Sequence, residues 1–176
     1  MKKFIPAILF LFFLCNFSFA QNQYIIVPDK AGKKILKGII SQELLTGDTS
    51  FKWYAENLSG YTPNAEAVIA LKKNIDSIEL ITFLGTWCDD SQFIIPKFYT
   101  LLDASGFSKN KVTLIGVDRT KKTLSHLAEA LNIINVPTII VMKDGKELGR
   151  VVEYGKYGMF DKELAEIINS NGSAVH

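Results

Sequence analysis

The chain has 176 residues, of which 48% are hydrophobic and 22% are charged, and its formal net charge at pH 7 is +2. This length suits one domain with a sizeable core. No run of basic residues is longer than two. The chain therefore lacks the cluster of basic residues that is typical of proteins that bind nucleic acid or an anionic membrane surface. We expect it to bind neither nucleic acid nor such a membrane.

The first 20 residues have the pattern of a secretory signal peptide. Two lysines precede an apolar stretch, residues 4–14, and Ser18-Phe19-Ala20 stands where cleavage is expected. Such a segment is removed on export, so we predict a periplasmic or secreted protein with no stable membrane insertion after cleavage. A retained anchor is the alternative, which the short apolar stretch disfavours. Both lysines leave with the segment, so 18 basic residues remain against 18 acidic ones.

Residues 21–61 are expected to form an N-terminal extension that packs on the core. Apolar and β-branched residues at 35–40 predict a short strand. Ser50 is a candidate cap for the short helix that follows it. Trp53 and Tyr54 are expected to pack this extension against the sheet, and a role in docking a substrate is the alternative.

The main domain, residues 62–172, begins with a helix and a strand. Thr62-Pro63 is typical of a helix start, and Ala67, Ile69, Ala70 and Leu71 supply an apolar face. Residues 78–84 are apolar and β-branched, as in a buried strand.

A cysteine follows this strand. Residues 85–87 lead into Cys88, and beyond it apolar residues recur at helical spacing through residues 94–102. Cys88 is therefore predicted at a helix N-terminus, where unpaired N–H groups and the helix dipole favour thiolate over thiol. Asp89 and Asp90 act against this effect, because neighbouring carboxylates disfavour a second anion.

Cysteine counting also singles out Cys88. Cys15 leaves with the signal peptide, so Cys88 is the only cysteine of the mature chain and no intramolecular disulfide can form. A single cysteine in an oxidising compartment indicates a reactive thiol or an intermolecular partner. An inert buried cysteine is the alternative, but the strand-to-helix junction favours a nucleophile.

A second β-α unit and a hairpin complete the domain. Residues 111–118 predict a strand, and the helix after it has an apolar face of Leu124, Leu127, Ala128 and Leu131. This β-α-β-α order implies a parallel pair of strands with a helical crossover. Residues 138–152 predict an antiparallel hairpin, because Asp144-Gly145 is a strong turn signal.

The last amphipathic helix is expected around residues 160–168. Its apolar face includes Phe160, Leu164 and Ile168, with Asp161 as a candidate cap and a stop near Gly172. A short tail, residues 173–176, would follow.

The central motif resembles the thioredoxin superfamily. Trp87, Cys88 and Ser91 match its strand, Trp-Cys-x-x-(Cys or Ser), helix pattern. Pro96 matches the proline that kinks the active-site helix of that family, and Val136-Pro137-Thr138 matches its cis-proline loop. The resemblance covers residues 63–169. It implies an α/β, thioredoxin-like fold, with a central mixed β-sheet flanked by helices.

The resemblance also implies roles for individual residues. Cys88 would be the nucleophile, Trp87 would flank it, and a cis Val136-Pro137 loop beside the thiol would align an extended substrate chain through its backbone.

Two positions depart from the family pattern. Ser91 stands where a dithiol enzyme has its second cysteine, so a mixed disulfide on Cys88 would persist until an external thiol attacked it. The Ser91 hydroxyl would instead hydrogen-bond to the thiolate and favour it. Thr82 stands where dithiol thioredoxins carry a buried acid.

A metal site built from Cys88, Asp89 and Asp90 is disfavoured, because no histidine lies nearby in the sequence and the helix dipole already accounts for the carboxylates. We expect neither a metal nor another cofactor. His126 is expected to be solvated.

The function that these patterns favour is single-cysteine thiol–disulfide exchange. Cys88 and Ser91 are the predicted catalytic residues, and Trp87, Val136 and Pro137 are the predicted substrate-binding residues. The expected partners are thiols and disulfides of proteins or small molecules. The alternative is a thioredoxin-fold module that binds partners or acts as a chaperone and catalyses nothing, because the fold alone does not decide function.

Overall fold

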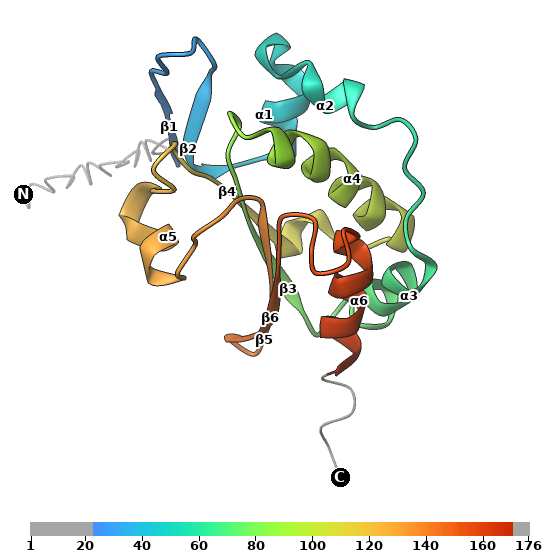
Figure 1. Cartoon of the computed structure of the whole chain (residues 1–176). Coiled ribbons are helices and arrows are strands. Elements are labelled where there is room, and N and C mark those ends of the chain that lie inside the picture. The colour runs from blue at the N-terminus through green and yellow to red at the C-terminus, as the bar shows by residue number, and fades with distance from the viewer. Residues whose placement is uncertain (1–22, 171–176) are drawn as a thin grey trace, which may run out of the picture.

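A six-stranded mixed β-sheet lies at the centre of the molecule, with helices on both faces (Figure 1). The computed structural model describes residues 23–170. The predicted signal peptide, residues 1–20, the predicted tail, residues 173–176, and the predicted stop at Gly172 lie outside the described residues. The strands are β1 (Tyr24–Val27), β2 (Ile35–Ile40), β3 (Glu79–Leu84), β4 (Val112–Gly116), β5 (Thr138–Lys143) and β6 (Lys146–Val152), in the order β1-β2-β4-β3-β5-β6.

The helices divide between the two faces of the sheet. One face carries α3, α4 and α6, which pack against one another over the larger apolar core, and the other carries the short α5 over a smaller core (Figure 1). The helices are α1 (Gln42–Gly47), α2 (Trp53–Glu56), α3 (Ala65–Lys73), α4 (Asp89–Ser105), α5 (Leu127–Ala130) and α6 (Phe160–Ser170), with 3-10 turns η1 (Thr49–Phe51), η2 (Lys109–Lys111) and η3 (Leu124–His126). Within residues 23–170, every helix is too short or too polar to cross a lipid bilayer.

The predicted strand pairing is confirmed. β3 and β4 are parallel and α4 forms the crossover between them, while β5 and β6 form the antiparallel hairpin. Asp144 and Gly145 both have positive φ, 50° and 74°. These angles suit the tight hairpin turn that an Asp-Gly pair favours.

The N-terminal segment adds two strands to one edge of the sheet. β2 confirms the strand predicted at residues 35–40 and pairs antiparallel with β4, and β1 pairs with β2. β1 was not predicted. Gly38 has φ of 120°, and a Cβ there would clash with the backbone of Gln23. Only glycine therefore allows β1 to lie this close to β2.

α4 is the long helix that the sequence predicts after the cysteine. Its side chains Ile94, Phe98 and Leu102 are fully buried in the larger core. Pro96 lies inside the helix, and Gly106 ends it in the left-handed conformation with φ of 71°. A glycine here is the common helix stop, because it adopts this conformation without steric cost.

Two predicted helix starts and one predicted core residue are wrong. Asp48 caps η1 by accepting a hydrogen bond from the N–H of Ser50, so Ser50 is the donor and not the cap. α3 begins two residues after Pro63, and Asn64 caps it in place of Thr62. Ile69 is 52% exposed and does not belong to the buried face of α3.

Two predictions for the later helices also need correction. Instead of one helix over 124–131, η3 and the single turn α5 follow each other across Ser125 and His126, both with positive φ. His126 is exposed, as expected. Asp161 is a buried residue within the first turn of α6, and its carboxylate accepts hydrogen bonds from the Tyr61 hydroxyl, 2.8 Å, and the Asn64 N–H, 2.9 Å.

Candidate active site

Cys88 is the residue immediately before α4, at the end of a tight turn from β3. Its N–H donates to the carbonyl of Gly85, 2.9 Å, and its own carbonyl accepts from the N–H of Gln92, 2.9 Å. Its backbone is extended, with φ of −90° and ψ of 124°, and its side chain is partly exposed. The thiol therefore lies at the positive end of a 17-residue helix, where a negative charge on sulfur is favoured.

The loop before β5 lies next to this thiol. The Val136-Pro137 peptide bond is cis, as the sequence motif predicts. The Sγ of Cys88 donates a hydrogen bond to the carbonyl of Val136 at 3.2 Å. The two segments are 48 residues apart in the chain, so the fold brings together the cysteine and the proline loop that the sequence singled out separately.

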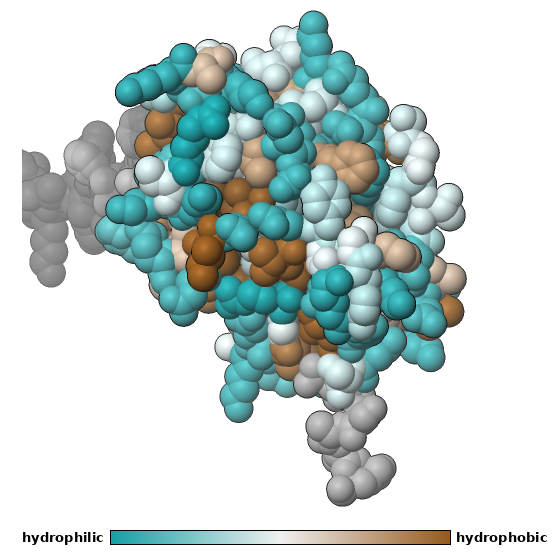
Figure 2. Space-filling model, in the orientation of Figure 1, coloured by the Kyte–Doolittle hydropathy of each residue, from teal (hydrophilic) through white to brown (hydrophobic). Residues whose placement is uncertain are grey.

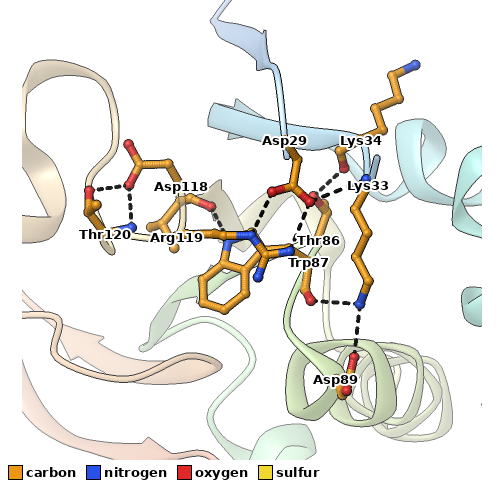
Figure 3. Close-up of polar contacts among 10 residues, drawn as sticks. Asp29, Lys33, Lys34, Thr86, Trp87, Asp89, Asp118, Arg119 and Thr120 are labelled. Carbon is orange, nitrogen blue, oxygen red and sulfur yellow. Dashed lines mark hydrogen bonds and ion pairs between the residues drawn. The ribbon is translucent and has the colours of Figure 1, made fainter. Parts of the chain in front are cut away.

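Trp87, the residue before the cysteine, has its side chain held by two contacts. Its indole N–H donates to the carbonyl of Val117, 3.0 Å, and the guanidinium of Arg119 lies over its ring, 5.1 Å from the ring centroid (Figure 3). A cation over an indole face is attracted by the ring's electron distribution. Trp87 therefore flanks the cysteine in one defined orientation.

Ser91 has a different partner from the one that the sequence suggested. It is fully buried, and its Oγ accepts a hydrogen bond from the N–H of Gly85 at 3.1 Å. The Cys88 thiol bonds to Val136. The hydrogen bond of Ser91 thus ties the first turn of α4 to the turn before Cys88 and does not go to the sulfur.

Thr82, in the middle of β3, is also fully buried. Its Oγ1 has no hydrogen-bond partner among residues 23–170. A buried hydroxyl without a partner is destabilising by about 1–3 kcal/mol. The position where dithiol members of the family carry an acid therefore holds an unpaired hydroxyl in this chain.

Two aromatic side chains that the sequence analysis missed form a wall beside the thiol. Phe93 and Tyr154 are 43% and 38% exposed, and their ring centroids lie 5.8 Å apart. Burial raises the pKa of Tyr154, and a hydrogen bond from its hydroxyl to Asp90 and the charges of Asp90 and Cys88 raise it further. Nothing in the sequence pointed to Tyr154, because it is 66 residues away from the cysteine. In the orientation of Figure 1, apolar surface lies in the middle of the molecule, between α4 and α5 (Figure 2).

Lys97 holds Phe93 in place from inside α4. Its ammonium group lies over the Phe93 ring, 3.5 Å from the centroid, and donates to the carbonyls of Asn57, 2.7 Å, and Phe93, 3.2 Å. Burial lowers the pKa of this lysine. A buried cation thus packs against the Phe93 ring of the aromatic wall.

The loop between β1 and β2 lies against the cysteine turn (Figure 3). Asp29 accepts two hydrogen bonds from Arg119, at 2.8 and 2.9 Å. The Thr86 hydroxyl donates to the carbonyl of Lys34, 2.8 Å, and accepts from the N–H of Leu36, 3.2 Å. These contacts were not predicted, and they join segments 50 to 90 residues apart.

The described residues contain no group of three or more His, Cys, Asp and Glu side chains placed to hold a metal ion. Asp89 is instead ion-paired with Lys33, at 3.1 Å.

A cysteine at the start of a proline-containing helix and in contact with a cis-proline loop, on a mixed sheet of this strand order, defines a protein of the thioredoxin-like class. A family model described as Thioredoxin matches residues 65–168. The chain belongs to the thioredoxin family. This membership suggests a thiol–disulfide redox function. The match does not include β1, β2 or the loop between them.

Individual relatives show the same family. Thioredoxin H2-2 of Oryza sativa subsp. japonica is 32% identical over 104 residues, which are 59% of this chain and 72% of that protein. A thioredoxin of Chlamydia pneumoniae is 30% identical over 109 residues, 58% of this chain and 96% of that protein. Among solved structures, thioredoxin O2 from Arabidopsis thaliana in the oxidized state matches 59% of this chain and 83% of its own, with 21% identity and a TM-score of 0.38.

Proposed function

We propose that this protein exchanges thiols and disulfides through Cys88 alone, and that it does so after export to the periplasm or the medium. The observation that carries the proposal is the position of the Cys88 sulfur, at the N-terminus of α4 and 3.2 Å from the Val136 carbonyl of the cis-proline loop. The first feature favours the nucleophilic thiolate, and the second supplies a backbone acceptor beside it.

The chemistry of the forward step follows from this geometry. The Cys88 thiol loses its proton to solvent, and the thiolate attacks one sulfur of a substrate disulfide. A new S–S bond forms to Cys88, the substrate S–S bond breaks, and the second substrate sulfur leaves as a thiolate that takes up a proton. The Cys88 sulfur is oxidised and the leaving sulfur is reduced, so no further oxidant is needed.

Deprotonation also changes the cis-proline loop. The Val136 carbonyl accepts the Cys88 S–H in the free protein, and it is released when that proton leaves. The free carbonyl can then accept an N–H from an extended substrate chain, which is recognition by strand addition. Val136 and Pro137 thus align the substrate, and Trp87 and the Phe93–Tyr154 wall border it on either side.

Ser91 determines what happens to the product. A serine cannot attack the mixed disulfide, so release needs an external thiol from a protein or a small molecule. Ser91 itself supports the turn before Cys88 through its bond to Gly85, 3.1 Å. We therefore propose a monothiol oxidoreductase in which Ser91 shapes the site.

The second candidate is a binding or chaperone-like module. The exposed Phe93 and Tyr154 side chains favour it, because an aromatic wall beside a backbone acceptor can hold an extended peptide with no chemistry at all. The two functions differ in whether a covalent adduct forms on Cys88.

The test is to follow adducts by mass spectrometry. The mature chain and its Cys88→Ser variant are mixed with bis(2-hydroxyethyl) disulfide, and separately with a protein that carries one exposed disulfide. With bis(2-hydroxyethyl) disulfide we expect a mass increase of one half of the molecule in the parent, and with the protein disulfide an increase of the whole substrate protein, because its leaving thiol stays on the same chain. Added thiol should reverse both adducts, and Cys88→Ser should form neither. Binding of the substrate protein by both the parent and Cys88→Ser, with no adduct in the parent, would contradict exchange and support the binding module. Fractionation of cells that make the full chain tests export.

A further inference from the structure

The loop between β1 and β2 reaches the residues on both sides of Cys88. The Nζ of Lys33 donates to the carbonyl of Trp87, 3.1 Å, and forms an ion pair with the Oδ1 of Asp89, also at 3.1 Å (Figure 3). One ammonium group thus binds the residue before the cysteine and the residue after it. Lys33 lies outside the residues that match the family.

The loop that carries Lys33 is itself anchored. Asp29, four residues earlier, forms the bidentate pair with Arg119 and also accepts the N–H of Lys33 at 3.3 Å. On the other side, the carbonyl of Lys34 accepts the Thr86 hydroxyl at 2.8 Å. Because the loop is anchored both before Lys33, at Asp29, and after it, at Lys34, the Lys33 ammonium group is held near the cysteine turn at little further cost in conformational entropy.

We propose that Lys33 is a positioning residue for the Cys88 thiolate, which holds the Trp87–Asp89 turn from outside α4 and offsets the negative charge of the Asp89 carboxylate. This inference rests on the proposed exchange function. An unopposed carboxylate next to Cys88 raises the free energy of the thiolate by repulsion, and a cation bound to that carboxylate removes part of the repulsion.

Other charged or titratable groups surround the thiol, and the test must allow for them. On α4 itself they are Asp89 and Asp90. From the segments packed around it they are Lys33, Arg119, Glu153 and Tyr154. Arg119 already pairs with Asp29, and Asp90 acts on Tyr154, whose pKa it raises. Lys33 is thus the cation directly paired with the carboxylate that follows Cys88.

The experiment measures the rate of alkylation of Cys88 by iodoacetamide as a function of pH, because only the thiolate reacts. Lys33→Met should slow alkylation at pH 7 by roughly two- to fivefold, the range for an exposed ion pair, and shift the midpoint of the profile upward by about half a pH unit. Lys33→Arg should restore most of the rate. Lys30→Met, in the same loop, is the matched control and should follow the parent.

A double-mutant cycle assigns the effect to the Lys33–Asp89 pair. Asp89→Asn should shift the midpoint downward, and adding Lys33→Met to Asp89→Asn should change it far less than Lys33→Met changes the parent. Both side chains reach solvent, so salt at about 1 M should shrink the difference between Lys33→Met and the parent. Thermal unfolding checks that the fold is unchanged.

Two results would overturn the proposal. One is a Lys33→Met profile that coincides with the parent, and the other is an equal slowing by Lys33→Met whether residue 89 is Asp or Asn. Alkylation needs no disulfide substrate. A parent that is alkylated normally and forms no mixed disulfide would therefore contradict the proposed function, while the role of Lys33 would still be decided by the cycle.

Discussion

The two sides of Cys88 are built in opposite ways. On the side of the cis-proline loop lie a backbone carbonyl, that of Val136, and two partly exposed rings, those of Phe93 and Tyr154. On the side of Trp87, the polar groups are paired with one another: Arg119 with Asp29, and Lys33 with Asp89. The first side has exposed rings and a carbonyl whose hydrogen-bond partner is the thiol itself, and the second side uses its groups to hold the turn.

This difference separates recognition from positioning. Uncharged rings and a carbonyl suit an extended chain of varied sequence, because the backbone carries the hydrogen bonds. Ion pairs between separate segments fix geometry instead. A change on the cis-proline side should therefore alter how substrates bind, and a change on the Trp87 side should alter the thiol itself.

The largest effect is expected from Ser91→Cys, which would add a second thiol in the first turn of α4. This variant should form an internal disulfide and release mixed disulfides without an external thiol, a reaction that the parent cannot complete. It should lose about 1 kcal/mol of stability, because a thiol is a weaker acceptor for the Gly85 N–H than the hydroxyl it replaces. Single-turnover release of a mixed disulfide, followed by mass spectrometry, measures the gain.

The Ser91→Cys experiment has an internal control. Thr82→Asp in the same background should raise the release rate further, since it supplies the acid that the family pattern places there, whereas Thr82→Asp alone should give no release. Two cysteines that stay reduced under mild oxidation would show that residues 88 and 91 are not placed for a resolving reaction.

A smaller effect is expected from the aromatic wall on the cis-proline side. Tyr154→Ala should weaken capture of a protein disulfide by roughly three- to tenfold, since an aromatic pair contributes about 1 kcal/mol. The pH profile of alkylation should change much less than the capture rate. Tyr154→Phe keeps the ring next to Phe93 and loses only the hydroxyl, so it should retain most of the capture. Equal losses in both variants would assign the effect to the Tyr154 hydroxyl and not to its ring.

The smallest effect concerns the Asp29–Arg119 pair on the Trp87 side. Hydrogen bonds from Arg119 lower the pKa of Asp29 from 3.8 to about 2. A carboxyl group whose pKa is lower in the folded state contributes stability above its unfolded pKa, and this contribution is lost as the pH falls through the folded value. The free energy of unfolding of Asp29→Asn should therefore be lower than that of the parent at pH 5–8. The two values should converge as the pH falls toward 2. Chemical denaturation at several pH values measures this convergence, and a constant difference would contradict it.

The features that the sequence alone determined are local or carried by a family motif. Apolar β-branched residues in β3, helical spacing in α4 and the Asp144-Gly145 turn each depend on neighbours within a few residues. The position of Cys88 at a helix start follows from the junction of two such patterns. The cis peptide at Pro137 followed from the resemblance, because sequence physics by itself does not distinguish a cis from a trans proline.

The features that only the tertiary structure decided depend on residues that are distant in the chain. Ser50 and Thr62 looked like helix caps, but Asp48 and Asn64 take those places. Several polar residues compete for each helix end, and the packing of the chain selects among them. β1 could not be predicted either, because four residues form a strand only when a sheet edge is present to pair with them.

The surroundings of the thiol were decided in the same way. Ser91 has Gly85 as a partner only because the turn folds back over the helix, and Lys33 meets Asp89 from 56 residues away. Charged and aromatic side chains on a surface carry no periodic signal that would show which of them will meet. The position of the proposed nucleophile, Cys88, is thus encoded locally, whereas its electrostatic environment exists only once the β1–β2 loop, α4 and the segment after β6 have been brought together by burial of the core.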